Sequence, residues 1–259
     1  MMRMVQSDVL STPLRAWTGG SAGARAVVFL HGFEQHPGAA PWLEKLAESR
    51  PVYAPEAPGF GGSAHPADLV DMQDLVLHYR ALLTPLVAEH GRVDLVGHSL
   101  GGMFAAEIAI ACPDLVERLV LVNAYGLWSE DLPQPDVFVM PQPEFNGAKW
   151  ADPAQAALET NSFDGPEQNY VYYRSANLGA ASRYMWPLAD RGLVRRLKYL
   201  RQPVLVLHGT ADGLVPEGYA DLWAEKISGA RVEKIPGAGH LPMVEAEGAF
   251  LAALQRFLD

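Results

Sequence analysis

The chain has 259 residues, of which 49% are hydrophobic and 19% charged, which fits a globular protein of one large domain or one domain with an insertion. Its net charge of −10 excludes a strongly basic surface, so we expect no nucleic-acid partner. One cysteine, Cys112, excludes an intramolecular disulfide. Neither a secretory leader nor a run of about 18 apolar residues is present, so we expect a cytoplasmic protein without a membrane span.

Short apolar runs alternate with longer segments of helical periodicity, a pattern that predicts an α/β fold with helices on both faces of a mostly parallel, doubly wound sheet of about eight strands. The N-terminal stretch from Val5 to Trp17 is predicted to add an antiparallel hairpin at the sheet edge. The other predicted strands are Ala26 to Leu30, Val52 to Ala54, Val93 to Val96, Leu119 to Val122, Val204 to Leu207 and Arg231 to Ile235. The predicted helices are Leu69 to Glu89, Leu100 to Cys112, Tyr219 to Ile227 and Ala246 to Leu258.

The stretch from Leu127 to Gly192 interrupts this rhythm. It contains no strong buried strand, its prolines are clustered and its aromatic residues are dense, and the strand pattern resumes only at Pro203. A structureless loop of this length is improbable inside a compact domain. We therefore predict a helical lid (cap) insertion at residues 127–192 and a core domain made of residues 1–126 and 193–259.

The most specific motif is Gly97-His98-Ser99-Leu100-Gly101-Gly102, directly after a predicted strand and directly before a predicted helix. This is the G-x-S-x-G nucleophile elbow in the context that it requires. A strained strand-to-helix turn exposes the serine hydroxyl, and the flanking glycines leave room for the crowded backbone. The elbow predicts that Ser99 is a catalytic nucleophile and that the backbone N–H of Leu100 faces a developing oxyanion.

A second amide for the oxyanion is predicted at Phe33. The sequence His31-Gly32-Phe33 follows the predicted strand that ends at Leu30, and such a turn can bring the N–H of Phe33 above Ser99. A tight turn without a catalytic role is the simpler interpretation of His31 and Gly32. The two interpretations are compatible.

Asp212 and His240 are the predicted partners of Ser99. Asp212 lies just beyond a buried strand, where ligands collect in open α/β sheets, and His240 lies in a glycine-rich loop between the last strand and the last helix. Taken alone, each could be an idle surface residue. The order Ser99, Asp212, His240 is the order expected of a catalytic triad on this fold, so we predict a general base at His240 and an orienting carboxylate at Asp212.

These motifs resemble the α/β-hydrolase superfamily, in particular its capped serine esterase, lipase and lactonase-like branch, and the likeness covers nearly the whole chain except the lid. Pro55-Glu56-Ala57-Pro58-Gly59-Phe60-Gly61-Gly62-Ser63 resembles the family's D-x-P-G-x-G-x-S loop, with Glu56 where aspartate is usual, and implies structural shaping of the site. The Gly-Ala-Gly-His-Leu-Pro segment with Glu245 downstream is also typical. Some relatives carry the acid after the preceding strand, but that position is Asn123 here, followed by Glu130 and Asp131, so Asp212 is preferred.

The resemblance implies a carboxylic ester hydrolase acting through an acyl-enzyme on Ser99, on small to medium, mainly apolar esters or lactones. Ser99 argues against haloalkane dehalogenases and epoxide hydrolases, which use an aspartate nucleophile. Carbon–carbon bond hydrolases of ring-fission diketones often carry tryptophan after the catalytic histidine, and Leu241 stands there, which disfavours that class without excluding it. A slow-turnover ligand receptor, perhydrolase, haloperoxidase, acyltransferase or lyase also stays open.

The predicted substrate pocket is apolar and aromatic, and core packing is the competing explanation for many of its residues. Its predicted lining residues are Phe33, Tyr125, Trp128, Trp186, Val215 and Leu241. Glu34, next to the oxyanion loop, could sense a polar substrate group or face solvent. No metal-ligand spacing, P-loop or dinucleotide fingerprint is present, so we predict no cofactor and no metal. The expected partner is a small-molecule ester, and the expected protein is a monomer or homodimer.

Overall fold

A computed structural model of the chain describes residues 1–259 except 22, 34–39 and 159–169, and describes the backbone alone at 156–158 and 170–173. In this described part, eight strands form one sheet in the order β1-β2-β4-β3-β5-β6-β7-β8. β1 and β2 form an antiparallel edge hairpin, β2 pairs antiparallel with β4, and the other pairs are parallel. The strands are β1 (Arg3–Val9), β2 (Thr12–Gly19), β3 (Val27–Leu30), β4 (Val52–Pro55), β5 (Val93–His98), β6 (Val116–Val122), β7 (Val204–Gly209) and β8 (Arg231–Ile235).

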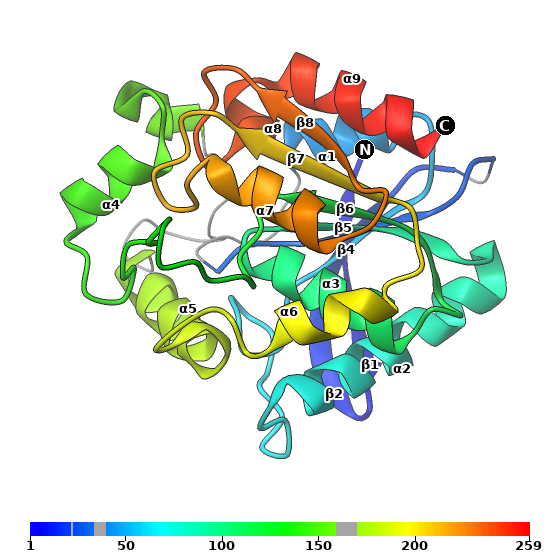
Figure 1. The fold of residues 1–259 in the computed structure, drawn as a ribbon. Helices are drawn as coiled ribbons and strands as arrows, with labels where there is room; N and C mark the ends of the chain where they lie inside the picture. Colours follow the sequence, from blue (N-terminus) through cyan, green and yellow to red (C-terminus); the bar gives the residue numbers. More distant parts are fainter. Residues whose placement is uncertain (22, 34–39, 159–169) are drawn as a thin grey trace.

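Helices connect the parallel strands and cover both faces of the sheet, with α9 and α1 on one side and α2 and α3 on the other (Figure 1). The helices are α1 (Pro41–Leu46), α2 (Met72–His90), α3 (Leu100–Ala111), α4 (Gln142–Lys149), α5 (Tyr170–Met185), α6 (Leu193–Arg196), α7 (Gly218–Lys226), α8 (Pro242–Glu245) and α9 (Glu247–Leu258), with short 3-10 turns η1 (Pro153–Leu158) and η3 (Leu197–Tyr199). Among the described residues, none of these helices has the length and hydrophobicity needed to cross a membrane.

Alternation along the central strands divides the core into two layers. On β5, Leu95 packs with α2 and α3, whereas Val96 packs with α1 and α9. Because successive strand side chains point to opposite faces, a strand covered by helices on both sides must be apolar at every position. This explains the continuous hydrophobic runs of the sequence and leaves the carboxyl ends of the strands for polar residues.

The predicted fold is confirmed, including the edge hairpin and the weak strand at Arg231–Ile235. Two details differ. The helix expected from Leu69 begins at Met72, because Asp71 accepts hydrogen bonds from the backbone N–H of Gln73 and Asp74 and so caps it. The short helix α1, opened by Pro41, was not expected. Between β6 and β7 lie α4, η1, α5 and α6, and α4 and α5 stand beyond the tips of the β7 and β8 arrows (Figure 1).

Candidate active site

Ser99 occupies a strained turn between β5 and α3. Its backbone has φ 56° and ψ −122°, a region that non-glycine residues rarely adopt. A Cβ at Gly97 would lie 2.3 Å from the carbonyl oxygen of Gly101, and one at Gly101 would lie 2.2 Å from that of Leu30. Glycine is therefore required at both places for the chain to turn this sharply. The backbone N–H of Ser99 donates to the carbonyl of Val122 (2.9 Å), which fixes the turn to the end of β6.

The structure brings the three predicted catalytic side chains together, although they come from distant parts of the chain. Nε2 of His240 lies 2.9 Å from Oγ of Ser99, and Nδ1 lies 2.8 Å from Oδ2 of Asp212. All three residues are buried. Since a carboxylate can only accept, Nδ1–H donates to Asp212, which leaves Nε2 to accept the hydroxyl proton of Ser99.

Both oxygens of Asp212 are held. Oδ1 accepts from the backbone N–H groups of Leu214 (2.8 Å) and Val215 (3.0 Å), while Oδ2 also accepts from Nδ2 of Asn123 at 2.5 Å. Asn123 stands at the end of β6 with φ 44° and also accepts from the backbone N–H of Gly209. This side chain, at the position where some relatives carry their acid, fixes the carboxylate that faces His240.

The loop that carries His240 is fastened by Glu245 and by the end of α4. Oε1 of Glu245 accepts from the backbone N–H of Gly239 (3.0 Å) and Leu241 (3.3 Å), and Oε2 accepts from that of Ala151 (2.9 Å). The backbone N–H of His240 donates to the carbonyl of Lys149 (2.8 Å). Residues 149–151 are therefore hydrogen-bonded to the histidine loop in both directions.

The turn after β3 lies against the elbow. A Cβ at Gly32 would stand 2.9 Å from Nδ1 of His98 and 3.0 Å from Cβ of Ser99, so glycine allows this close approach. The backbone N–H of Ala57 donates to Nε2 of His31 (2.8 Å), so the proton of His31 is on Nδ1, which lies 2.7 Å from the carbonyl of Gly32. His31 thereby links the turn to the loop after β4.

That loop is organised around Glu56, which is fully buried. Its carboxylate accepts from Nε (3.0 Å) and Nη2 (2.7 Å) of Arg15, from the backbone N–H of Gly62 (3.0 Å) and from the hydroxyl of Ser63 (2.8 Å). A buried carboxylate needs this many donors to offset its desolvation. Glu56 therefore has a structural place in the loop, as the resemblance implies.

The histidines near His240 are kept neutral while the carboxylate is kept charged. Burial, with the charge of His240, holds the pKa of His98 well below its usual range, and Nε2 of His98 donates to the carbonyl of His240 (2.8 Å). Burial also lowers the pKa of His208. Burial alone would raise the pKa of Asp212, but interactions with His240 lower it below its usual value. The negative charge therefore stays next to His240.

A narrow pocket with a volume of about 10 Å³ lies beside Ser99. Of the predicted pocket residues, Phe33 and Leu241 line it. Tyr125 lies behind it, with its ring centroid 6.1 Å from that of His240. The described lining residues are Gly32, Phe33, His98, Ser99, Phe145, Lys149, His240 and Leu241.

The other predicted pocket residues lie elsewhere. Trp128 and Tyr125 line a separate pocket, Trp186 is 56% exposed, and Val215 is fully buried with its N–H on Asp212. Trp128, Trp186 and Val215 are therefore not among the described residues that line the Ser99 pocket. Glu34 lies outside the described residues.

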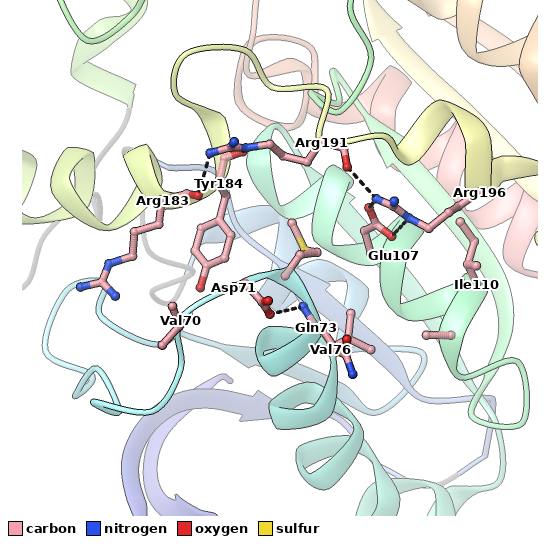
Figure 2. Close-up of a pocket in the computed structure, with 12 residues that line it drawn as sticks. Val70, Asp71, Gln73, Val76, Glu107, Ile110, Arg183, Tyr184, Arg191 and Arg196 are labelled. Atoms are coloured by element: carbon pink, nitrogen blue, oxygen red, sulfur yellow. Dashed lines mark hydrogen bonds and ion pairs between the residues drawn. The ribbon is translucent and has the colours of Figure 1, made fainter.

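A larger pocket, with a volume of about 560 Å³, lies between α2, α3 and residues 183–196 (Figure 2). Figure 2 shows Arg196 facing Glu107: Nε of Arg196 donates to Oε2 at 2.9 Å and Nη2 pairs with Oε1. Arg191 donates to backbone carbonyls at the end of α5. These contacts are the kind that fasten a helix end, and the pocket includes no described residue of the Ser99 site.

Residues 27–254 match the alpha/beta hydrolase family, and the chain belongs to this family and is a hydrolase. It is 27% identical over 277 residues to 2-hydroxymuconate semialdehyde hydrolase from Pseudomonas sp. strain CF600, covering 97% of this chain and 93% of that protein. It is 25% identical over 252 residues to pimeloyl-[acyl-carrier protein] methyl ester esterase from Nitrosomonas europaea, covering 87% of this chain and 92% of that protein.

Among solved structures, 2-hydroxy-6-oxo-6-phenylhexa-2,4-dienoate hydrolase from Rhodococcus sp. strain RHA1 is similar with a TM-score of 0.78 and 22% identity, covering 99% of both chains. At this identity the likeness concerns the fold. One of these two relatives is named as a hydrolase of a semialdehyde and the other as a methyl ester esterase, so family membership alone does not identify the substrate of this chain.

Four residues of the site were given no catalytic-site role from the sequence. The sequence identifies Asn123 only as a position where some relatives carry an acid, and Glu245 only as typical of the family's terminal segment. At His31 it predicts a turn, with no hydrogen bond to Ala57. Lys149 was not singled out, because a lysine near the end of a helix has no sequence signal that distinguishes a buried ammonium from a solvated one.

Proposed function

We propose that the chain hydrolyses carboxylic esters or lactones through an acyl-enzyme on Ser99. The observation that carries this proposal is the continuous hydrogen-bond chain from Ser99 through His240 to Asp212. The hydroxyl of Ser99 attacks the acyl carbonyl while Nε2 of His240 takes its proton. Asp212 holds the imidazole tautomer and stabilises the imidazolium.

This attack forms a tetrahedral intermediate, which then collapses to the acyl-enzyme. Its oxyanion is held by the backbone N–H groups of Phe33 and Leu100, each worth about 3 kcal/mol in comparable sites. His240 returns the proton to the leaving alcohol. A water activated by His240 next attacks the acyl-enzyme and releases the acid, which restores Ser99.

In this proposal residues 127–192 form the lid over a core of residues 1–126 and 193–259. In support, the helices α4 and α5 and the turn η1 lie within this range, in the connection between β6 and β7. The hydrogen bonds of residues 149–151 connect the end of α4 to the His240 loop of the core. We propose that the apolar part of the substrate contacts Phe33 and Leu241. The oligomeric state, monomer or homodimer, stays a prediction.

The test is hydrolysis of p-nitrophenyl acetate and butyrate by wild type, Ser99→Ala and the exposed control Ser228→Ala. Loss of the nucleophile is expected to lower kcat/KM on the order of 10⁴-fold or more, since triad members act as a unit. The control is expected to match wild type. Undiminished activity of Ser99→Ala would contradict the proposal.

A second candidate is hydrolysis of a carbon–carbon bond in a ring-fission diketone. It is favoured by the relatives named as 2-hydroxymuconate semialdehyde hydrolase and 2-hydroxy-6-oxo-2,4-heptadienoate hydrolase. Turnover of such a dienoate far above that of simple esters, again dependent on Ser99, would replace the ester proposal.

A further inference from the structure

Residues 183–201, from the end of α5 through α6 and η3, form a strongly basic segment in a chain that is acidic as a whole. They include six of the 20 lysines and arginines but only one of the 30 aspartates and glutamates. The six basic residues are Arg183, Arg191, Arg195, Arg196, Lys198 and Arg201. Five of them are exposed, and among the described residues only Arg196 forms an ion pair with a carboxylate, that of Glu107. The basic segment therefore presents a concentrated positive charge to the solvent.

The fold gathers several of these charges at one turn. Arg191 reaches back over the end of α5, where its Nη2 donates to the carbonyl of Arg183 at 3.1 Å. The carbonyl of Arg191 in turn accepts from Nη2 of Arg196 at 3.2 Å (Figure 2). A Cβ at Gly192 would stand 2.5 Å from Nη2 of Arg195 and 3.3 Å from Nη1 of Arg196. Three of the six positive charges therefore lie around the turn at Gly192.

The basic segment also has an apolar side that packs on the core. Leu193 in α6 and Leu197 in η3, four residues apart, are buried in the same cluster as the side chains of α3. Arg195 and Lys198 lie on the exposed side. Residues at this spacing share one face of a helical turn, so the leucines hold the segment on the core and turn its charges outward. The positive charge is thus a fixed part of this face of the molecule.

Large apolar side chains are exposed within the same surface. Trp186 is 56% exposed, Leu188 41% and Tyr199 55%. The carbonyl of Trp186 accepts from Nη2 of Arg191 at 2.7 Å, and Nζ of Lys198 lies 5.1 Å from the ring centroid of Tyr199. Exposed aromatic residues next to lysine and arginine are typical of surfaces that lie in the headgroup region of a membrane.

We infer that the basic segment binds the surface of an anionic phospholipid membrane. Its arginines and lysine would contact the lipid phosphates, and Trp186, Leu188 and Tyr199 would enter the headgroup region. In the rest of the chain 29 aspartates and glutamates face 14 lysines and arginines, so an anionic surface is attracted to this segment and repelled by most of the remaining chain. The exposed apolar side chains favour a membrane over a soluble polyanion, because they are removed from water only where apolar material adjoins the negative charge. The inference concerns where the protein acts and does not depend on the ester chemistry at Ser99.

The test is co-sedimentation of the full chain with vesicles of phosphatidylcholine, either alone or with about one third phosphatidylglycerol. Wild type is expected to bind the anionic vesicles about tenfold more tightly or better, and to lose this preference as the NaCl concentration increases. Arg195→Glu with Lys198→Glu reverses two exposed charges of the segment and is expected to reduce binding to the level seen on neutral vesicles. The matched control is Arg3→Glu with Arg231→Glu, which changes the net charge equally at exposed positions outside the segment. It is expected to stay within about threefold of wild type, because distant charges are screened.

Trp186→Ala tests the apolar contact and is expected to weaken binding to the anionic vesicles by about fivefold or more. Leu10→Ala, which truncates a 69% exposed side chain in the turn between β1 and β2, is the control and should bind as wild type does.

Equal binding of wild type to both kinds of vesicle would overturn the inference, and so would wild-type binding by the charge-reversed variant. Loss of binding in that variant together with undiminished binding by Trp186→Ala would indicate a general polyanion site, such as one for an acidic polypeptide, and would overturn the assignment to a membrane. Should the charge-reversed variant lack a cooperative thermal unfolding transition, Arg195→Gln with Lys198→Gln takes its place, with the same two outcomes.

Discussion

Nδ2 of Asn123 donates a 2.5 Å hydrogen bond to the same oxygen of Asp212 that faces Nδ1 of His240. The amide and the imidazole therefore both donate hydrogen bonds to the same carboxylate oxygen. It also ties the end of β6 to the carbonyl of Gly239 in the histidine loop (3.2 Å). The two positions at which this fold can carry an acid are thus occupied by a carboxylate and by the amide that orients it.

Replacing this amide by a carboxylate, in Asn123→Asp, is expected to shift the acid limb of the pH profile of kcat/KM upward by about 1 unit. Two buried carboxylates in contact raise the apparent pKa of the pair, because both cannot stay ionised at low cost. The added negative charge also stabilises the imidazolium, which acts in the same direction. The profile is measured with p-nitrophenyl butyrate between pH 4 and 9.

Gln255→Glu on α9 adds the same charge at a half-buried position with no described contact to Asp212 or His240, and should leave the limb in place. An unchanged acid limb in Asn123→Asp would show that the amide is not coupled to the Asp212–His240 pair.

Glu245→Gln is expected to lower kcat roughly tenfold with a smaller change in KM. The amide group of glutamine can replace only one of the two carboxylate oxygens, so at least one of the backbone N–H groups of Gly239, Leu241 and Ala151 loses its acceptor. The histidine loop then loses part of its fixation, and stability is expected to fall by about 1–3 kcal/mol. Kinetics and urea unfolding measure both effects, with Glu225→Gln on the exposed face of α7 as control. Wild-type kcat in Glu245→Gln would refute a positioning role for this carboxylate.

The sheet and the serine elbow were predictable because their causes are local. A strand buried on both faces is apolar along its whole length, and the elbow needs glycine at fixed spacing around Ser99. Elements that depend on one cap residue were placed less accurately: the start of α2 is set by the side chain of Asp71. The short helix α1 has too few residues to show a period.

The supports of the site were not predictable, because each depends on contacts between segments far apart in the sequence. Asn123 and Asp212 are 89 residues apart, and Ala151 and Glu245 are 94 apart. Burial of Lys149 depends likewise on how α4 packs over the histidine loop. Aromatic density predicted a substrate role for Trp128 and Trp186, but aromatic residues fill cores and surfaces as readily as pockets.

Two glycines are expected to respond oppositely to alanine. A Cβ at Gly101 would lie 2.2 Å from the backbone oxygen of Leu30, which cannot move aside, so Gly101→Ala is expected to destabilise the protein by several kcal/mol. Gly147, inside α4, has open space at this position, and Gly147→Ala is expected to stabilise it by about 0.5–1 kcal/mol. Thermal unfolding of both variants measures the contrast. Equal effects would mean that the elbow tolerates a displacement of β3.

Asp94, on β5 and away from the proposed reaction, predicts a pH-dependent cost of folding. Its side chain is fully buried, with Arg118 Nη1 at 3.4 Å and Arg25 Nε at 3.7 Å. Burial raises its pKa to about 6, and the two arginines offset this only in part. The folded state therefore holds a proton on Asp94 that the unfolded chain releases near pH 4. The stability from this group is complete below the unfolded pKa and is lost as the pH rises through about 6.

Asp94→Asn removes this titration, so the free energy of unfolding of the variant relative to wild type is expected to increase between pH 4 and pH 7. A shift of about two pKa units corresponds to about 3 kcal/mol as an upper value. Urea unfolding at several pH values measures the difference, and the exposed Asp68→Asn serves as control for the general effect of losing a carboxylate. Because every other titrating group is common to wild type and variant, its contribution cancels in the difference. A difference that stays constant from pH 4 to pH 7 would mean that Asp94 keeps its charge in the folded protein, and that the arginines fully compensate for its burial.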